Sequence, residues 1–116
     1  MLSLGRATKV IIHLNEDTSS SHDFVYRELF AFLLEQGVAG ATLIRPEAGF
    51  GSHHRIHSQH GEGAEGQHLP VRIEFIESPE RLESLLPELF RLTTDGLIEA
   101  HETTILKLAM TGPEPL

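Results

Sequence analysis

The sequence predicts an α+β fold, in which a four-stranded antiparallel sheet carries two helices on one face. Residues 8–14 and 69–77 alternate in polarity and are rich in β-branched side chains, which is typical of strands. Two further segments repeat apolar residues at helical spacing. With 116 residues and 40% hydrophobic content, we expect one domain, residues 1–116, that buries a real core.

The first half of the chain indicates a strand, a helix and a second strand. Residues 8–14 form the strand, and a polar loop follows it. Ser20 with Asp23 resembles a capping box at the start of a helix. The apolar repeat of that helix stops before Gly37, which is a typical C-terminal glycine. Residues 40–46 then predict a short strand that ends at a proline.

The second half begins with the clearest strand, residues 69–77. Ser78 and Pro79 supply an N-cap and a first-turn proline for the second helix. Pro87 lies inside this helix and is expected to kink or split it, because it cannot donate to the preceding turn. The apolar stripe of this helix is Leu82, Leu85, Leu86 and Leu89.

The last element is a strand over residues 97–108, which follows a turn at Asp95 and Gly96. Residues 111–116 are expected to form a frayed tail. The resulting β-α-β-β-α-β order is that of the ferredoxin-like arrangement.

One sheet face has no helix to cover it and mixes charged with apolar side chains. We expect this face to associate with other subunits, since exposed apolar surface tends to be buried. For His13 on the first strand, a subunit contact and a purely structural role both stay open. Glu74 and Glu77 are expected to be surface charges. The residues assigned to this face are Lys9, Ile11, His13, Arg72, Glu74 and Ile76.

Composition excludes several classes of function. The 17 acidic and 9 basic residues give a net charge of −8, which argues against nucleic-acid binding. Without cysteine, the chain has no disulfide, thiolate metal site or cysteine nucleophile. The longest apolar run, residues 30–34, is far shorter than the roughly 20 residues of a membrane span. No secretory signal is visible, so we expect a cytoplasmic protein that is not inserted in a membrane.

Residues 47–68 form an unusually long loop for so small a domain, which indicates a function or disorder. Gly49 and Gly51 allow close backbone approach and an anion-binding nest, or merely a flexible entrance. Arg45 and Arg55 flank this entrance, where each is able to pair with a phosphate or to form an ordinary surface ion pair. We expect residues 51–66 to be mobile without a ligand.

The same loop is rich in histidine and suggests a second possibility. Some of its histidines are three or four residues apart, a spacing that would bring imidazoles together around Zn²⁺ or Cu²⁺ if the segment were helical. The neighbouring glycines oppose a helix, and the alternative is a solvated loop that titrates near neutral pH. The candidate metal ligands are His53, His54, His57 and His60.

Residues 37–58 contain a dense series of motif residues, which are Gly37, Gly40, Ala41, Thr42, Arg45, Gly49, Phe50, Gly51, Ile56 and His57. This series resembles a bacterial and archaeal family known as domain of unknown function 190. The resemblance extends over nearly the whole chain, because the "LPV" of the third main strand, the "LP" inside the second helix and the "DGL" turn also match.

This family is similar to the PII signalling proteins, and that similarity implies a fold and a binding mode. PII proteins are trimers of ferredoxin-like subunits that bind adenine nucleotides between subunits, near the base of a long T-loop. Residues 47–68 are the implied T-loop equivalent. PII proteins have a lysine directly after the turn before the last strand, and Leu97 takes its place here, which favours AMP or ADP over ATP. The implied ligand-binding residues are Arg45, Gly49, Phe50, Gly51, Arg55, His57, Thr94, Asp95 and Gly96.

The resemblance therefore implies a homotrimeric regulatory protein without catalytic activity or a resident cofactor. It would bind AMP or ADP and signal through residues 47–68 to a target protein, such as a transporter or a metabolic enzyme. The alternative is a divalent-metal module similar to the CutA-like trimers, with the histidine-rich loop as its ligand source. The sequence has no convincing acid/base pair, nucleophile arrangement or cofactor motif for an enzyme.

Overall fold

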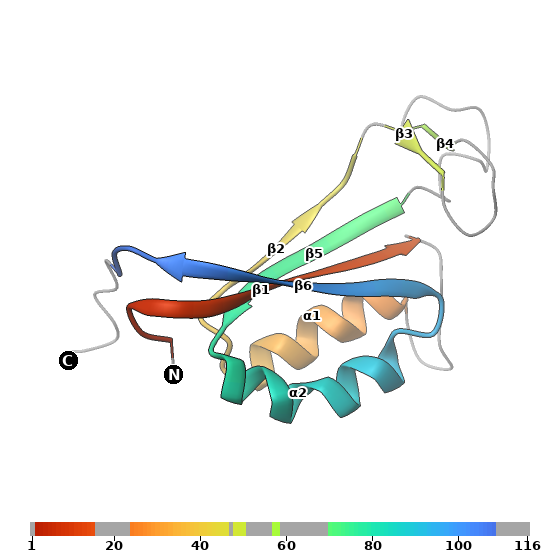
Figure 1. Cartoon of the computed structure of the whole chain (residues 1–116). Coiled ribbons are helices and arrows are strands. Elements are labelled where there is room, and N and C mark those ends of the chain that lie inside the picture. The colour runs from red at the N-terminus through yellow and green to blue at the C-terminus, as the bar shows by residue number, and fades with distance from the viewer. Residues whose placement is uncertain (1, 16–23, 47, 51–56, 59–69, 109–116) are drawn as a thin grey trace, which may run out of the picture.

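The computed structural model contains a single four-stranded sheet with both helices on one of its faces (Figure 1). It describes residues 2–15, 24–46, 48–50, 57–58 and 70–108. The sheet order is β2-β5-β1-β6, and every neighbouring pair is antiparallel. This confirms the predicted α+β, ferredoxin-like arrangement. The elements that build it are β1 (Gly5–Asn15), α1 (Val25–Glu35), β2 (Ala41–Ile44), β5 (Pro70–Glu77), α2 (Pro79–Leu92) and β6 (Gly96–Ile105).

A second, two-stranded pair lies between β2 and β5. Its strands are β3 (Ala48–Gly49) and β4 (His57–Ser58), which pair antiparallel. The sequence predicted only a loop here, because two-residue strands are too short to show an alternating pattern. The rest of the segment expected to be mobile, including residues 51–56, lies outside the described residues, as does the expected frayed tail.

The core lies between the helices and the sheet face that they cover. Alternate residues of β1 and β5 point to this face, and Val10 of β1 stands opposite Phe75 of β5. Burying apolar side chains of this kind is the main driving force for folding. The buried cluster comprises Val10, Ile12, Leu14, Val25, Tyr26, Leu29, Leu33, Val71, Ile73, Phe75, Leu82, Leu85 and Leu89.

Helix α1 starts later than the expected capping box implies. Its N-cap is Phe24, which makes no side-chain cap hydrogen bond, while Ser20 and Asp23 lie outside the described residues. The predicted stop at Gly37 is confirmed, with a positive φ of 73°. The amide of Gly37 donates to Leu34 O at 3.1 Å and that of Val38 to Leu33 O at 3.2 Å. This is the Schellman pattern of a glycine-terminated helix.

Helix α2 begins as predicted, because the Ser78 hydroxyl accepts a hydrogen bond from the amide three residues later at 3.2 Å. The expected split at Pro87 is wrong, since the helix continues without a break to its end (Figure 1). Pro87 is exposed, whereas Leu85 and Leu89 on either side of it are buried against the core. Both halves of the helix are thus anchored to the core despite the missing amide.

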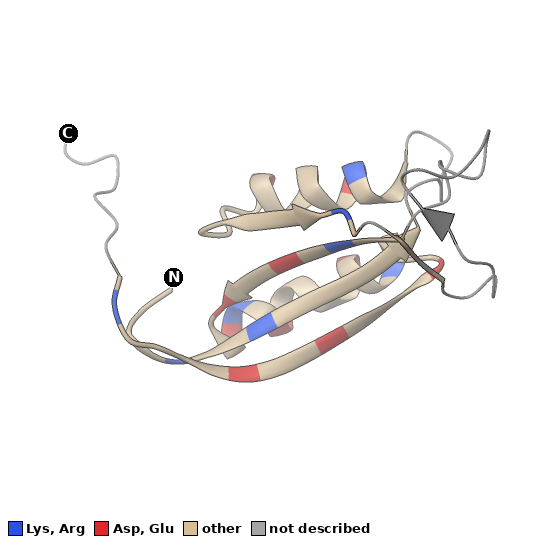
Figure 2. Cartoon of the chain, turned by 90° about the horizontal axis from the view of Figure 1, so that it is seen from above, with Lys and Arg blue, Asp and Glu red and all other residues tan. Residues whose placement is uncertain are grey.

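The other sheet face carries no helix, and the strands of the sheet contain residues of both charge signs (Figure 2). Glu74 lies there between two cations, 3.5 Å from Lys9 and 3.0 Å from Arg72. The expectation that Glu77 is also a surface charge is wrong. Glu77 is 2% exposed and accepts a hydrogen bond from the Ser78 amide at 2.9 Å. It continues the core-facing alternation of β5, which is why a charged residue is buried there.

Neither α1 nor α2 has the length and apolar character that a helix needs to cross a membrane.

Candidate functional site

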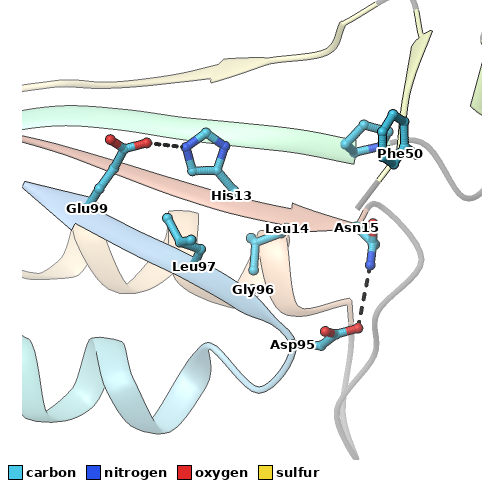
Figure 3. A pocket seen from close by; sticks show the side chains of 9 residues that line it. His13, Leu14, Asn15, Phe50, Asp95, Gly96, Leu97 and Glu99 are labelled. Carbon is cyan, nitrogen blue, oxygen red and sulfur yellow. Dashed lines mark hydrogen bonds and ion pairs between the residues drawn. The ribbon is translucent and has the colours of Figure 1, made fainter. Parts of the chain in front are cut away.

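A cavity of about 510 Å³ lies where β1 ends and β6 begins (Figure 3). The start of β5 and the residue that follows β3 complete its wall. This volume falls within the usual range for small-molecule sites, about 300–1,000 Å³. Its apolar lining consists of Leu14, Phe50, Pro70 and Leu97, its polar lining of His13, Asn15, Asp95 and Glu99, and Gly96 lies between them.

The antiparallel register brings these segments together. Asn15 at the end of β1 stands opposite Pro70 of β5, and His13 stands opposite Leu97 of β6. Gly96 allows β6 to approach β1 at this point. Any side chain at Gly96 would place its Cβ atom too close to the His13 carbonyl oxygen. Cβ atoms in known proteins do not approach a neighbouring atom this closely. The close strand pairing beside the cavity therefore requires glycine.

The first polar group of the cavity is a carboxylate held by two histidines. His13 Nε2 donates to Glu99 Oε2 at 2.5 Å, and His101 Nε2 donates to Glu99 Oε1 at 2.6 Å. The hydrogen bond from His13, followed by that from His101, lowers the pKa of the Glu99 carboxyl below its ordinary value of 4.5. Glu99 is therefore an ionised acceptor with a fixed orientation at neutral pH.

The second polar group lies at the other end of the cavity (Figure 3). Asn15 Nδ2 donates to Asp95 Oδ2 at 3.5 Å, which joins the end of β1 to the turn before β6. Both polar groups thus contain a carboxylate, and no lysine or arginine is among the described residues that line the cavity. Such a wall suits hydrogen-bond donors that carry no negative charge.

Phe50 supplies an aromatic surface to the same cavity. Phe50 follows β3 directly and is 66% exposed to solvent. An exposed ring beside polar acceptors is able to stack on a planar ligand, a contact that contributes beyond simple area burial. The cavity therefore combines a stacking surface with two anionic hydrogen-bond acceptors.

Three of the residues predicted to bind ligand line this cavity: Phe50, Asp95 and Gly96. Gly49 belongs to β3 and pairs with His57 of β4, so both lie in the short ladder next to Phe50 in the chain. The remaining loop candidates, Gly51 and Arg55 for the ligand and His53, His54 and His60 for a metal, lie outside the described residues.

Arg45 and Thr94 do not line the cavity. Arg45 contacts helix α1, where its guanidinium donates to the Tyr26 hydroxyl at 3.4 Å and its central carbon lies 5.6 Å from the centre of that ring. Thr94 is exposed in the bend between α2 and β6. Arg45 thus contacts Tyr26, and Thr94 lies beside, rather than in, the cavity, while ligand binding by either residue stays a prediction.

Sequence reasoning missed Glu99 and Asn15 and left His13 open between two structural roles. The signal that would have found Glu99 is the alternation that starts at Gly96, which puts residues 97, 99 and 101 on the helix-free face of β6. Since β6 pairs with β1, that face lies beside His13. Asn15 had no comparable sequence signal, because its relevance depends on the contact with the Asp95 turn.

The metal alternative receives no support from the part of the chain that the structure describes. No three histidine, aspartate or glutamate side chains there are arranged to hold a metal ion, and this includes the histidine pair around Glu99. Of the four predicted metal ligands only His57 is described, as part of β4. The metal-binding interpretation of the loop stays a prediction.

Comparison with known structures identifies the fold. CPII, a nitrogen regulatory PII-like protein from Thiomonas intermedia K12 bound to ADP, AMP and bicarbonate, matches with a TM-score of 0.64 and 20% identity over 92% of this chain and 94% of CPII. The apo form of CPII matches with a TM-score of 0.58 and 16% identity, over 89% of this chain and 95% of the CPII chain. A PII-like signalling protein from Thermus thermophilus matches with a TM-score of 0.57 and 20% identity, over 90% of this chain and 91% of the Thermus chain.

At these identities the structural matches establish the shared fold. The family model DUF190, described as "Uncharacterized ACR, COG1993", matches residues 7–105, which is most of the chain. The family predicted from residues 37–58 is thereby confirmed. The protein belongs to the DUF190 family and has the PII-like form of the ferredoxin-like fold.

Proposed function

We propose that this protein is a regulatory protein that binds AMP or ADP in the cavity beside Phe50 and signals through residues 47–68. The observation that carries the proposal is the position of Phe50. It follows β3, within the segment that would signal, and it lines the same cavity as Asp95 and Gly96 at the start of β6. A ligand in this cavity would contact both the fixed sheet and the signalling segment.

The chemistry of the cavity supports a nucleotide. Its volume of about 510 Å³ is suitable for a nucleoside with its phosphates near the opening. Phe50 offers a surface on which a purine is able to stack, and Asp95 and Glu99 offer acceptors for hydroxyl or amino groups. CPII, which shares the fold, has been solved with ADP and AMP bound.

The phosphates require cations from outside the described lining. Arg55 and the backbone amides of Gly49 and Gly51 are the proposed phosphate contacts, as the resemblance to the PII proteins implies. Leu97 lines the cavity at the position where PII proteins have a lysine, so less positive charge is present for a triphosphate. This favours AMP or ADP.

We further propose that the protein assembles as a homotrimer through the helix-free sheet face, with the ligand between subunits. That face carries Ile11 and Ile76 beside the ion pairs of Glu74, a mixture suited to a subunit contact. Light scattering at micromolar concentration should give three times the chain mass of 12.9 kDa. A monomer mass would refute the assembly.

Signalling would follow from contact of the ligand with Phe50. Stacking there would fix the β3–β4 pair against the end of the sheet and change the conformations open to residues 47–68, an order–disorder type of switch. The ordered segment would then engage or release a target protein, a transporter or a metabolic enzyme. No chemical step by this protein is required.

Calorimetry with AMP and ADP tests the proposal directly. Replacing Phe50 by alanine should weaken binding by about 1–3 kcal/mol, the range found for loss of base–aromatic stacking. Phe90 is a matched control, because it is an exposed phenylalanine on α2 that does not line the cavity. If the unmodified protein binds neither nucleotide, or if F50A and F90A behave alike, the proposal is wrong.

A further inference from the structure

Glu99 is held by two histidines at the cavity, and these surroundings limit what it is able to bind. Both of its carboxylate oxygens accept a histidine hydrogen bond, from His13 at 2.5 Å and from His101 at 2.6 Å. Each oxygen of an ionised carboxylate keeps a further lone pair after accepting one hydrogen bond. Glu99 is therefore able to accept from a ligand without giving up either histidine.

A phosphate group is a poor partner for this end of the cavity. Two like charges about 4 Å apart repel by about 1 kcal/mol in water and about 4 kcal/mol near a protein surface. Asp95 adds a second carboxylate to the lining of the cavity. The favourable occupants are groups that donate a hydrogen bond and carry no negative charge.

We propose that Glu99 is the specificity-determining residue of the cavity: its carboxylate accepts a hydrogen bond from a neutral donor on the nucleoside part of the ligand and thereby directs the phosphates away from the His13 end. The inference rests on the proposed nucleotide-binding function and adds which part of the ligand lies where. A nucleotide has two sources of such donors, the ribose hydroxyls and the adenine amino group, which nucleotide analogues are able to separate.

His101 has a positioning role in this arrangement. It lies outside the cavity and bonds to the Glu99 oxygen that His13 does not use. With a histidine on each oxygen, the carboxylate cannot rotate without breaking one of the two bonds. The preorganised acceptor costs less entropy on binding than a free side chain would.

The test compares ADP affinity in two alanine variants. Glu99→Ala should weaken ADP binding about tenfold or more, as expected for losing a hydrogen bond to a charged group. Glu102 is the matched control, because it is a carboxylate on the same strand that pairs with Arg6 at 2.7 Å outside the cavity. Removing the negative charge of Glu99 or of Glu102 should strengthen binding of an anionic ligand through long-range electrostatics. If E99A binds ADP more weakly and E102A does not, the loss is therefore not an effect of net charge.

Binding of nucleotide analogues to the unmodified protein identifies which group of the ligand donates the hydrogen bond to Glu99. This experiment does not require a variant that folds. 2′,3′-Dideoxy-ADP lacks both ribose hydroxyls, and purine riboside diphosphate lacks the amino group. One of them should bind about tenfold more weakly than ADP. The E99A variant should bind that analogue and ADP with equal affinity, because the acceptor is gone.

The outcomes separate this inference from the proposed function. If ADP binds but E99A binds it as well as or better than E102A, or if neither analogue loses affinity, the assignment of Glu99 is overturned while nucleotide binding stands. If the unmodified protein binds no ADP, the proposed function fails and the assignment fails with it.

The role of His101 has its own test. His101→Gln should weaken ADP binding in the unmodified background and have no effect on ADP binding in the E99A background, because His101 acts through Glu99. A double-mutant cycle of this kind measures the coupling between two residues. An equal effect of His101→Gln in both backgrounds would show an independent, structural contribution and would overturn the positioning role.

Discussion

Gly96 of β6 lies so close to β1 that any side chain there would collide with the backbone of His13. A Cβ at this position would overlap with the His13 carbonyl oxygen and would lie 3.0 Å from a methyl group of Leu14. Gly96 also lines the cavity and is one of the predicted ligand-binding residues. Its primary constraint is nevertheless the strand pairing that forms the cavity wall.

Gly96→Ala should therefore lower the free energy of unfolding by about 1–3 kcal/mol, the usual cost of overpacking. Because the atom in contact belongs to the backbone, the strands have to separate, and ADP affinity should fall as well. Gly40→Ala is the matched control, since a Cβ at Gly40 meets no atom within 4 Å. Urea denaturation compares the two variants, and equal stabilities would contradict the steric assignment.

Gly37 ends α1 with a φ of 73°, a conformation that costs other L-residues energy. Gly37→Ala should cost about 1 kcal/mol of stability, and Gly37→Asn should cost less, because asparagine tolerates this region better. No atom lies within 4 Å of a Cβ at Gly37, so steric contact does not contribute. Thermal unfolding measures both variants, and a destabilisation by asparagine as large as that by alanine would be inconsistent with a purely conformational cost.

Most of the fold could be predicted from the sequence, because its signals are local. The alternation in β5, the Ser78 cap and the Gly37 stop each depend on a few neighbouring residues, and the structure confirms all three. The start of α1 was misplaced since a polar loop contains several serines that look like caps. The actual N-cap is Phe24, which has no capping side chain.

The site was less predictable, because it depends on pairing between distant parts of the chain. His13 and Glu99 are 86 positions apart, and only the β1–β6 register brings them together. Phe50, Asp95 and Gly96 were found through family resemblance rather than from their local pattern. Burial of Glu77 was missed for a related reason: its charge suggested the surface, whereas strand alternation directs it to the core.

Pro87 interrupts the hydrogen bonding of α2 without ending the helix, so its replacement should be stabilising. Proline in a helix interior costs about 3 kcal/mol relative to alanine, and Pro87 is exposed. Pro87→Ala should raise the free energy of unfolding by about 1–3 kcal/mol. Glu83→Ala, at another exposed position of α2, is the control for general helix propensity. Equal effects of the two substitutions would show that Pro87 imposes no special cost in this fold.

Glu99 should make stability depend on pH in the acid range. The hydrogen bonds from His13 and His101 lower its pKa in the folded state below the ordinary 4.5. The folded state therefore binds the Glu99 proton less readily than the unfolded chain does. The resulting stabilisation is fully present above pH 4.5 and is lost as the pH falls through the lowered pKa of the folded state.

Glu99→Gln should consequently flatten the decline in stability below pH 4.5, because the amide does not titrate. Part of the decline should remain, since the pKa of Glu88 is also lowered, by its hydrogen bond with Arg91. Denaturant unfolding at a series of pH values measures both slopes, with Glu88→Gln as the matched variant and the double substitution flatter than either single one. A decline in E99Q as steep as that of the unmodified protein would mean that the two histidines do not hold the Glu99 carboxylate in solution.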